Sequence, residues 1–256
     1  MTPRAFLVRG LLAGLAAGIL TFGVAYVAGE PQVDAAIAVE EAVAAPADAH
    51  THDHAEEDPG TEVSRDNQST WGLATGTLAV SIVLGGVVGL VSAFAAGRIG
   101  RLRPGQSTAL VALLGFVAVA LVPFLKYPGT PPAVGNPDTI SSRTVEYFSM
   151  QSISLLAMIG AVLLARRLLS SMSTYRTLLI AGGAYLVVVI VAAVVLPTVN
   201  EIGNFPADTL WYFRRASLLT LATMWGAIGI ILTGLVGRLY ETESATAARR
   251  DLAATL

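Results

Sequence analysis

Six runs of the sequence are long, apolar and free of formal charge, and they constrain the fold more than any other feature. They cover residues 10–29, 71–97, 104–125, 147–165, 177–200 and 216–237, and each has at least 19 residues. At about 1.5 Å per residue, a helix of that length crosses a hydrocarbon layer of about 30 Å. Only 13% of all residues are charged, about half the share of a soluble domain. The sequence predicts an all-α integral membrane protein, a bundle of six transmembrane helices.

The distribution of basic residues predicts the orientation of this bundle. Residues 1–9, 98–103, 166–176 and 238–256 together carry eleven of the sixteen Lys and Arg residues, and the alternate connections carry five. Connections rich in Lys and Arg face the cytoplasm. We therefore expect both termini in the cytoplasm, three hairpins with outer loops, and a place in the bacterial inner membrane.

These runs divide the chain into consecutive parts. We expect a first transmembrane helix in 1–29, an acidic extracytoplasmic loop in 30–70, two helices in 71–125, a Pro-rich outer loop in 126–146, two helices in 147–196, a Pro-containing outer loop in 197–215, a sixth helix in 216–237 and a cytoplasmic tail in 238–256. The first run has an alternative interpretation as a cleaved signal peptide, which would leave five spans. Its apolar part has about 20 residues, longer than the 7–15 residues usual in a signal peptide.

Glycines repeat at intervals of four in the first two runs. The pairs are Gly10–Gly14, Gly14–Gly18, Gly72–Gly76 and Gly85–Gly89. In lipid, helices associate where small residues let two backbones approach closely. The glycines therefore predict tight packing within the bundle or, alternatively, a homo-oligomer.

Residues 30–70 differ in composition from the rest of the chain. They contain eleven of the eighteen acidic residues, all three histidines and a single base, Arg65. A stretch this charged and this poor in aromatic residues is expected to be disordered in its middle.

The histidines of this loop form the candidate metal site. His50, His52 and His54 alternate with other residues, and Asp48 and Asp53 lie among them. Neutral imidazole binds cobalt, nickel, copper and zinc, and carboxylates can complete the shell. The alternative is a solvated polar run in which the histidines have no such role. These residue types do not distinguish one of these metals from another.

The start of the loop is a candidate route for cations. Pro31 suits a first helical position, and Glu30, Asp34 and Glu41 would then share one helix face. Such carboxylates could pass cations inwards, or they could simply form a solvated face.

The other two outer loops share a plan. Each follows a proline near a helix end, Pro123 or Pro197, and each contains a later Pro-Ala step. Because proline disrupts helix interiors, we expect both segments to be rigid and non-helical. Asn200 and Glu201 are expected to end a helix, where carbonyls and a carboxylate can meet a cation or form interfacial caps and ion pairs. The candidate ion path at the outer face comprises Glu30, Asp34, Lys126, Asn200 and Glu201.

Four blocks of the sequence carry a family resemblance. They are GEPQVDAAIAVEEA at 29–42, SRDNQSTWGLATGTLAV at 64–80, VPFLKYPGTPPAVGNPDTISSRT at 122–144 and LPTVNEIGNFPADTLWYFRRASL at 196–218. These blocks resemble the CbtA family, the predicted membrane subunit of a cobalt transporter, over about residues 9–237. The resemblance implies cobalt uptake, a link to cobalamin synthesis, and a small single-span partner subunit with its own histidine motif.

The leading hypothesis is the membrane subunit of a cobalt or other divalent-metal uptake transporter. The alternative is a non-transporting membrane protein that binds metal, or assists assembly, for another permease. The sequence has no HExxH, GxSxG or GxxxxGK[ST] motif, so we expect neither an enzyme nor an ATPase. We expect the bilayer as a partner, no nucleic acid, and no cofactor apart from the transported ion.

Overall fold

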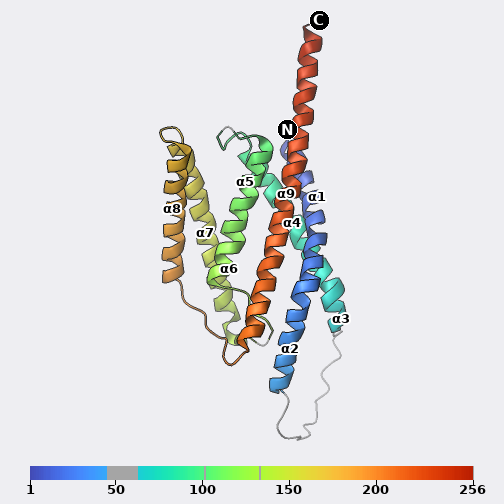
Figure 1. Cartoon of the computed structure of the whole chain (residues 1–256), viewed down its shortest axis with the longest axis vertical. Coiled ribbons are helices and arrows are strands. Elements are labelled where there is room, and N and C mark those ends of the chain that lie inside the picture. Colours follow the sequence, from blue (N-terminus) through green and yellow to red (C-terminus); the bar gives the residue numbers. More distant parts are fainter. Residues whose placement is uncertain (45–62, 101, 133, 256) are drawn as a thin grey trace.

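The computed structural model describes residues 1–44, 63–100, 102–132 and 134–255. The described part of the chain is helical and contains no strand. Six of its helical stretches are long and apolar enough to cross a membrane, which confirms the predicted fold class. They run along the long axis of the molecule and make three hairpins (Figure 1).

The helical stretches are assembled from the following elements. The first comprises α1 (Pro3–Val24), the π-helical turn η1 (Ala25–Gly29) and α2 (Glu30–Ala44). The second comprises α3 (Arg65–Asn67), the π-helical turn η2 (Gln68–Gly72) and α4 (Leu73–Ala95). The third comprises α5 (Pro104–Gly115), the π-helical turn η3 (Phe116–Leu121) and α6 (Val122–Lys126). The 3-10 turn η4 (Pro137–Thr139) precedes α7 (Ile140–Leu168), and α8 (Thr174–Val195) and α9 (Ala207–Ala254) follow.

The helices extend beyond several predicted ends. Helix α7 begins at Ile140 and α9 at Ala207, so parts of both Pro-containing loops are helical, contrary to expectation. Helix α8 ends at Val195, so the expectation that Asn200 and Glu201 end a helix is wrong. The length of an apolar run reflects the thickness of the hydrocarbon layer. A helix can continue beyond that layer as long as its backbone hydrogen bonds still form. Residues 127–132, 134–136 and 196–206 are non-helical, as expected.

Two prolines lie inside continuous helices, where the sequence favoured helix boundaries. Pro31 follows the π-helical turn η1 and Pro123 follows η3, each two residues after the turn ends. Proline lacks an N–H, and its ring clashes with the carbonyl four residues earlier in an α-helix. A wide π-helical turn changes the register of the hydrogen bonds just before the ring, so the helix continues.

Glycines bring α1 and α4 into backbone contact. A Cβ atom placed on Gly10 or Gly14 of α1 would collide with the carbonyl oxygen of Gly85 or Ser81 of α4. A Cβ on Gly89 would lie 2.7 Å from the carbonyl oxygen of Phe6. We call this contact the glycine interface: Gly10, Gly14 and Gly18 against Ser81, Gly85 and Gly89. The predicted packing within the bundle is confirmed for these glycines, whereas a Cβ on Gly76 would meet nothing within 4 Å.

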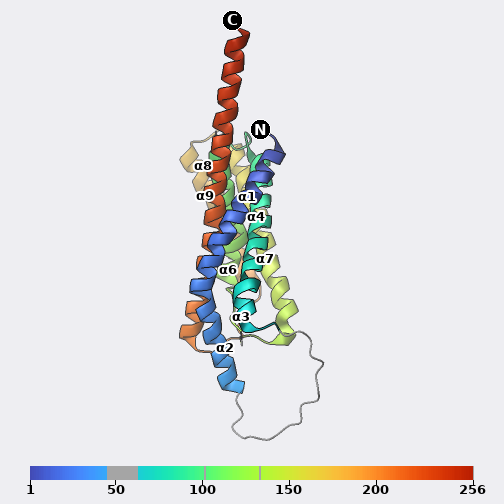
Figure 2. The ribbon, with the colours of Figure 1, turned by 90° about the vertical axis from the view of Figure 1, so that its right-hand side faces the viewer.

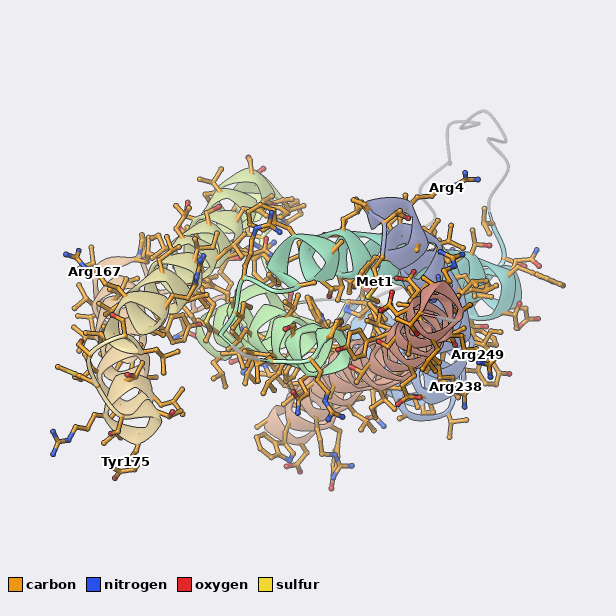
Figure 3. The ribbon with its side chains drawn as sticks, turned by 90° about the horizontal axis from the view of Figure 1, so that it is seen from above. Met1, Arg4, Arg167, Tyr175, Arg238 and Arg249 are labelled. Atoms are coloured by element: carbon orange, nitrogen blue, oxygen red, sulfur yellow. The ribbon has the colours of Figure 1, made fainter. Side chains whose placement is uncertain are left out.

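Two apolar clusters divide the bundle into two parts. The first cluster joins α1, α4, α5 and α9 and contains Phe6, Val88, Trp225, Ile228 and Leu232. The second joins the end of the third span to α7 and α8 and includes Met150, Met158 and Tyr185. Helices α7 and α8 accordingly lie to one side of the other spans (Figures 1 and 3), and they lie behind those spans in the view of Figure 2.

The connections gather at two ends of the molecule. Both termini lie at one end with the α4–α5 and α7–α8 connections, and we call this the terminus end (Figure 1). The α6–α7 and α8–α9 connections lie at the opposite end, beside α2 and α3, and we call this the loop end. Helix α9 extends past the bundle at the terminus end, so the predicted tail continues the helix as far as Ala254.

The glycine interface yields a stability prediction. Replacing Gly14 with Ala places a methyl group against the backbone of Ser81 and Ile82, and such overpacking costs about 1–3 kcal/mol. We expect Gly14→Ala to lower the free energy of unfolding by that amount in detergent micelles, measured by reversible denaturation. Gly76→Ala is the matched control and should keep or raise stability. Equal effects of the two substitutions would contradict the interface.

Candidate functional site

A cavity of about 540 Å³ opens at the loop end of the bundle. Side chains from five of the six spans and from both Pro-containing connections line it. The charged lining residues that the structure describes are Glu30, Lys126, Arg143, Glu201 and Arg214. Tyr127, Tyr147, Ser217 and Thr220 add hydroxyl groups, and the remaining lining is largely apolar. We call this space the loop-end cavity.

An arginine clamp joins the two helical segments that flank residues 45–62. Arg65 Nη2 forms an ion pair with Glu30 Oε2, and Nη2 and Nε donate to Asp34 Oδ1 at 2.8 and 3.1 Å. Glu30 and Asp34 are four residues apart on α2 and therefore share one face. Ser64 caps α3 by accepting from the N–H of Asn67 at 3.4 Å, which fixes the start of the helical segment that carries Arg65. The clamp thus holds the base of the acidic segment beside the cavity.

The end of α6 is held against the end of α8. Lys126 Nζ donates to the Leu196 carbonyl at 3.2 Å, and the Tyr127 hydroxyl donates to the Pro197 carbonyl at 2.7 Å. The ammonium group also lies 5.3 Å from the centre of the Tyr127 ring. A cation at the end of α8 complements the negative end of the helix dipole.

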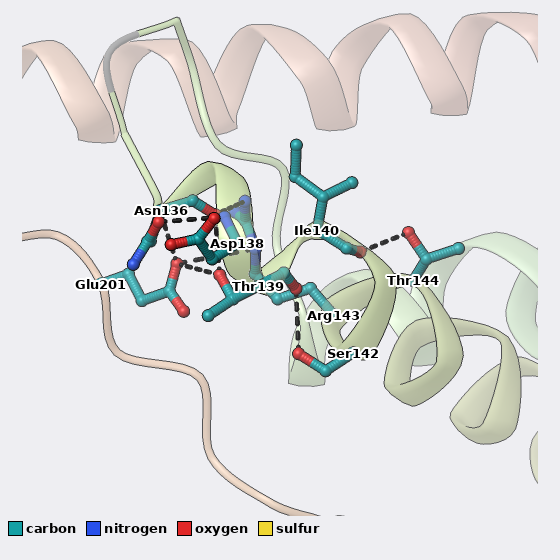
Figure 4. A network of polar contacts seen from close by, with 8 residues as sticks. All are labelled: Asn136, Asp138, Thr139, Ile140, Ser142, Arg143, Thr144 and Glu201. Carbon is teal, nitrogen blue, oxygen red and sulfur yellow. Dashed lines mark hydrogen bonds and ion pairs between the residues drawn. The ribbon is translucent and has the colours of Figure 1, made fainter.

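Glu201 joins the two Pro-containing connections to each other. Its Oε2 accepts from the Asn136 N–H and from the Thr139 hydroxyl, both at 2.9 Å, and lies 3.6 Å from Arg143 Nε (Figure 4). Arg143 Nη2 also donates to the Asn136 carbonyl at 3.2 Å. The Asn136 side chain accepts from the Asp138 N–H at 3.0 Å, which forms the turn before α7.

Gly135 makes room for the arginine of this network. Its φ is +110°, in the region that favours glycine. A Cβ at this position would collide with the Arg143 guanidinium, whose Cζ would lie 2.8 Å away. The backbone of Gly135 therefore forms one wall against which Arg143 is held near Glu201.

Hydrogen bonds and burial shift two groups at the cavity. The Asn136 N–H, the Thr139 hydroxyl and then the Arg143 charge lower the pKa of Glu201 below its ordinary value. Burial, and to a lesser extent the carboxylate of Glu146, raises the pKa of Tyr127 above its ordinary value. Glu201 is therefore ionised, and Tyr127 neutral, across the physiological range.

Comparison with known protein families identifies the family of this chain. Residues 3–237 match the CbtA family, which is described as a probable cobalt transporter subunit. The chain belongs to the CbtA family. The match covers all six spans and the residues of the loop-end cavity. No curated protein and no solved structure matches the chain.

For this member of the CbtA family, the structure brings some of the predicted site residues together. Glu30, Lys126 and Glu201 line one cavity, although they come from the start of α2, the end of α6 and the α8–α9 connection. Asp34 belongs to the arginine clamp but is exposed and does not line the cavity. Asn200 is also exposed and does not line the cavity. The predicted metal ligands His50, His52, His54, Asp48 and Asp53 lie outside the described residues. Within the described residues, no group of three or more acidic or histidine side chains is arranged to hold a metal ion.

Three arginines at this site were not selected from the sequence as functional residues: Arg65, Arg143 and Arg214. Arg65 is the only base among the acids of residues 30–70, and this isolation is a signal for an ion pair. Arg143 carries no comparable local signal, because its partner Glu201 lies in a different connection. Arg214 lies about two turns inside α9, and its Nε is buried without a hydrogen-bond partner among the described residues. The cavity lining of this CbtA protein is thus richer in cations than the sequence suggested.

The Glu201 network predicts a pH dependence of stability. Because the folded state lowers the pKa of Glu201 below 4.5, its contribution is fully present above about pH 5 and is lost as the pH falls through the lowered pKa. We expect wild type to unfold at a higher temperature than Glu201→Gln at neutral pH, and this difference to shrink on acidification below that range. Glu241→Gln, on the exposed part of α9, is the control. A difference that grows with acidification would contradict the network.

Proposed function

We propose that this chain is the membrane subunit of a cobalt uptake transporter in the bacterial inner membrane, with its loop end facing outwards. In this proposal, the segment that follows α2 collects the metal ion and the loop-end cavity receives it. The observation that carries the proposal is the position of Glu30. Its carboxylate lines the cavity and also anchors the arginine clamp at the base of the acidic histidine-containing segment.

Collection of the ion is the role of the histidine-containing segment. His50, His52 and His54, with Asp48 and Asp53, supply imidazole and carboxylate ligands suited to cobalt and related divalent metals. The surplus of acidic residues attracts cations to this segment. The clamp between α2 and α3 holds both flanks of the segment near the cavity, so an ion released from the histidines has a short distance to travel.

Entry into the cavity requires a change in the pairing of its carboxylates. Among the described residues, Glu30 and Glu201 each contact an arginine through Oε2. The lining also includes Lys126 and Arg214, so its charge opposes a bare cation. A divalent ion at either carboxylate has twice the charge of the arginine that it displaces. Exchange of an arginine for the metal would therefore couple arrival of the ion to release of the clamp.

The chain supplies a path and needs a partner for the rest of the process. Its sequence has no nucleotide-binding motif, and the CbtA description is that of a subunit. We propose a small single-span partner with its own histidine motif. Such a partner would receive or deliver the ion, and the energy source would lie outside this chain.

Replacement of the histidines tests collection. We expect His50→Ala/His52→Ala/His54→Ala to reduce uptake several-fold at low external cobalt. The loss should grow as the pH rises above about 6.5, where imidazole is free to bind metal. The measurement is uptake of labelled cobalt by cells that also produce the partner. Thr51→Ala, in the same segment, is the control.

Unchanged cobalt uptake by the triple variant across that pH range would show that the histidine-containing segment does not collect the metal ion. Reconstitution of the purified chain with its partner in liposomes separates transport from the alternative role in binding or assembly. If the liposomes take up no labelled cobalt under conditions in which cells do, the chain serves another permease.

Glu30 offers a test of the cavity. We expect Glu30→Gln to reduce cobalt uptake several-fold, because it removes a carboxylate from the cavity lining. Arg65→Gln breaks the same clamp and keeps that carboxylate, so it should reduce uptake less. Glu40→Gln, on the exposed side of α2, is the matched control. Equal losses in the Glu30 and Arg65 variants would mean that Glu30 acts only by holding the clamp.

A further inference from the structure

A second hollow lies on the side of the bundle, between the two apolar clusters. It has a volume of about 420 Å³ and is bordered by α4, the α5–η3 segment and α7, with Trp225 of α9 at its base. We call it the lateral groove. Its lining is apolar along nearly the whole length and includes Val87, Val91, Leu155 and Ile159, which are all exposed.

Two arginines mark one end of the lateral groove. Arg98 follows α4 and Arg166 lies in the last turn of α7, and both line the groove at the terminus end of the bundle. Arg98 Nη1 donates to the Phe94 carbonyl at 2.8 Å, and its guanidinium lies 4.9 Å from the centre of the Phe94 ring. Among the described residues, neither arginine forms an ion pair with a carboxylate.

The dimensions of the groove indicate what fits it. Its walls run from Leu84 to Ala95 on α4 and from Leu155 to Arg166 on α7, about 17 Å at 1.5 Å per residue. A volume of 420 Å³ over that length gives a mean cross-section of roughly 25 Å². A single hydrocarbon chain can therefore lie along the groove.

We propose that the lateral groove is a binding site for an anionic phospholipid. One acyl chain occupies the apolar length of the groove, and the phosphate headgroup pairs with Arg98 and Arg166. The groove and the ligand match in polarity along their whole length, since each is apolar except for one charged end. Basic pockets between transmembrane helices bind anionic headgroups in this way, and arginine is well suited to pair with phosphate.

A neighbouring hollow provides an internal comparison. The hollow between α5 and α9 also has apolar walls, but its lining contains no charged side chain among the described residues. Trp225 borders both hollows. Lipid that enters the uncharged hollow should do so without regard to its headgroup, so a preference for anionic lipid reports on the lateral groove.

The lipid would join the two parts of the bundle. The lateral groove lies between α4 and α7, and Val119 of the third span packs against both apolar clusters. An acyl chain in the groove would contact both walls at once. Anionic lipid would then stabilise the position of α7 and α8 relative to the other helices.

Quenching of Trp225 fluorescence tests this site. Trp71 and Trp211 are exposed, and Trp71→Phe/Trp211→Phe leaves Trp225 as the single reporter. The protein is placed in phosphatidylcholine vesicles that contain a small fraction of lipid with brominated acyl chains, carrying either a phosphatidylglycerol or a phosphatidylcholine headgroup. We expect the brominated phosphatidylglycerol to quench Trp225 at a several-fold lower mole fraction than the brominated phosphatidylcholine.

Variants of the arginines complete the test. Arg98→Gln/Arg166→Gln should abolish the headgroup preference, whereas Arg98→Lys/Arg166→Lys should retain most of it and shows that the fold tolerates change at these positions. Arg167→Gln is the matched control, because Arg167 points away from the rest of the bundle (Figure 3). Equal quenching by the two brominated lipids would overturn the proposal. So would a preference that survives loss of both arginines, or a groove that the single-span partner fills to the exclusion of lipid.

Discussion

Backbone contact between α1 and α4 is the constraint on which the rest of the bundle depends. In lipid, no hydrophobic effect drives helices together, so association relies on dispersion forces between closely packed atoms. The glycine interface brings the two backbones so close that no side chain fits between them. Helix α9 packs against this pair and carries Trp225, the largest side chain of the first cluster. Helix α5 packs against α4 and α9, and α7 and α8 lie to one side, against the third span.

The polar contacts at the loop end have a different role from the apolar contacts within the bundle. Each of them joins segments that are far apart in the chain: Arg65 to Glu30 and Asp34, Lys126 to Leu196, and Glu201 to Asn136 and Arg143. In water such pairs contribute little. Here they fix the geometry of irregular connections that have few backbone hydrogen bonds of their own. The loop-end cavity owes its shape to these contacts.

The sequence predicted the spans well because hydropathy reports directly on the bilayer. Each of the six apolar runs lies largely within one helical stretch of the structure. Helix ends were predicted less well, since α7 begins before its apolar run and α9 continues far beyond its own. The helix boundaries predicted at Pro31 and Pro123 were wrong for a related reason. The rule that proline ends a helix does not consider a π-helical turn just before the proline.

The candidate site was only partly accessible from the sequence. Glu30, Lys126 and Glu201 were selected from their positions at predicted helix ends, and they share one cavity. The arginine partners of Glu30 and Glu201 were missed because pairing depends on which segments meet in space, and hydropathy holds no information on that. Gly135 likewise gave no sequence signal that its backbone makes room for Arg143.

The paired prolines and π-helical turns have a mechanical consequence. Interrupted hydrogen-bond ladders are where helices bend most easily. The turn η1 ends directly before Glu30, and η3 ends at Leu121, five residues before Lys126. A flexion at either position would swing Glu30 or Lys126 without disturbing the glycine interface. Bending at η1 or η3 would thus change the separation of Glu30 and Lys126, which both line the loop-end cavity.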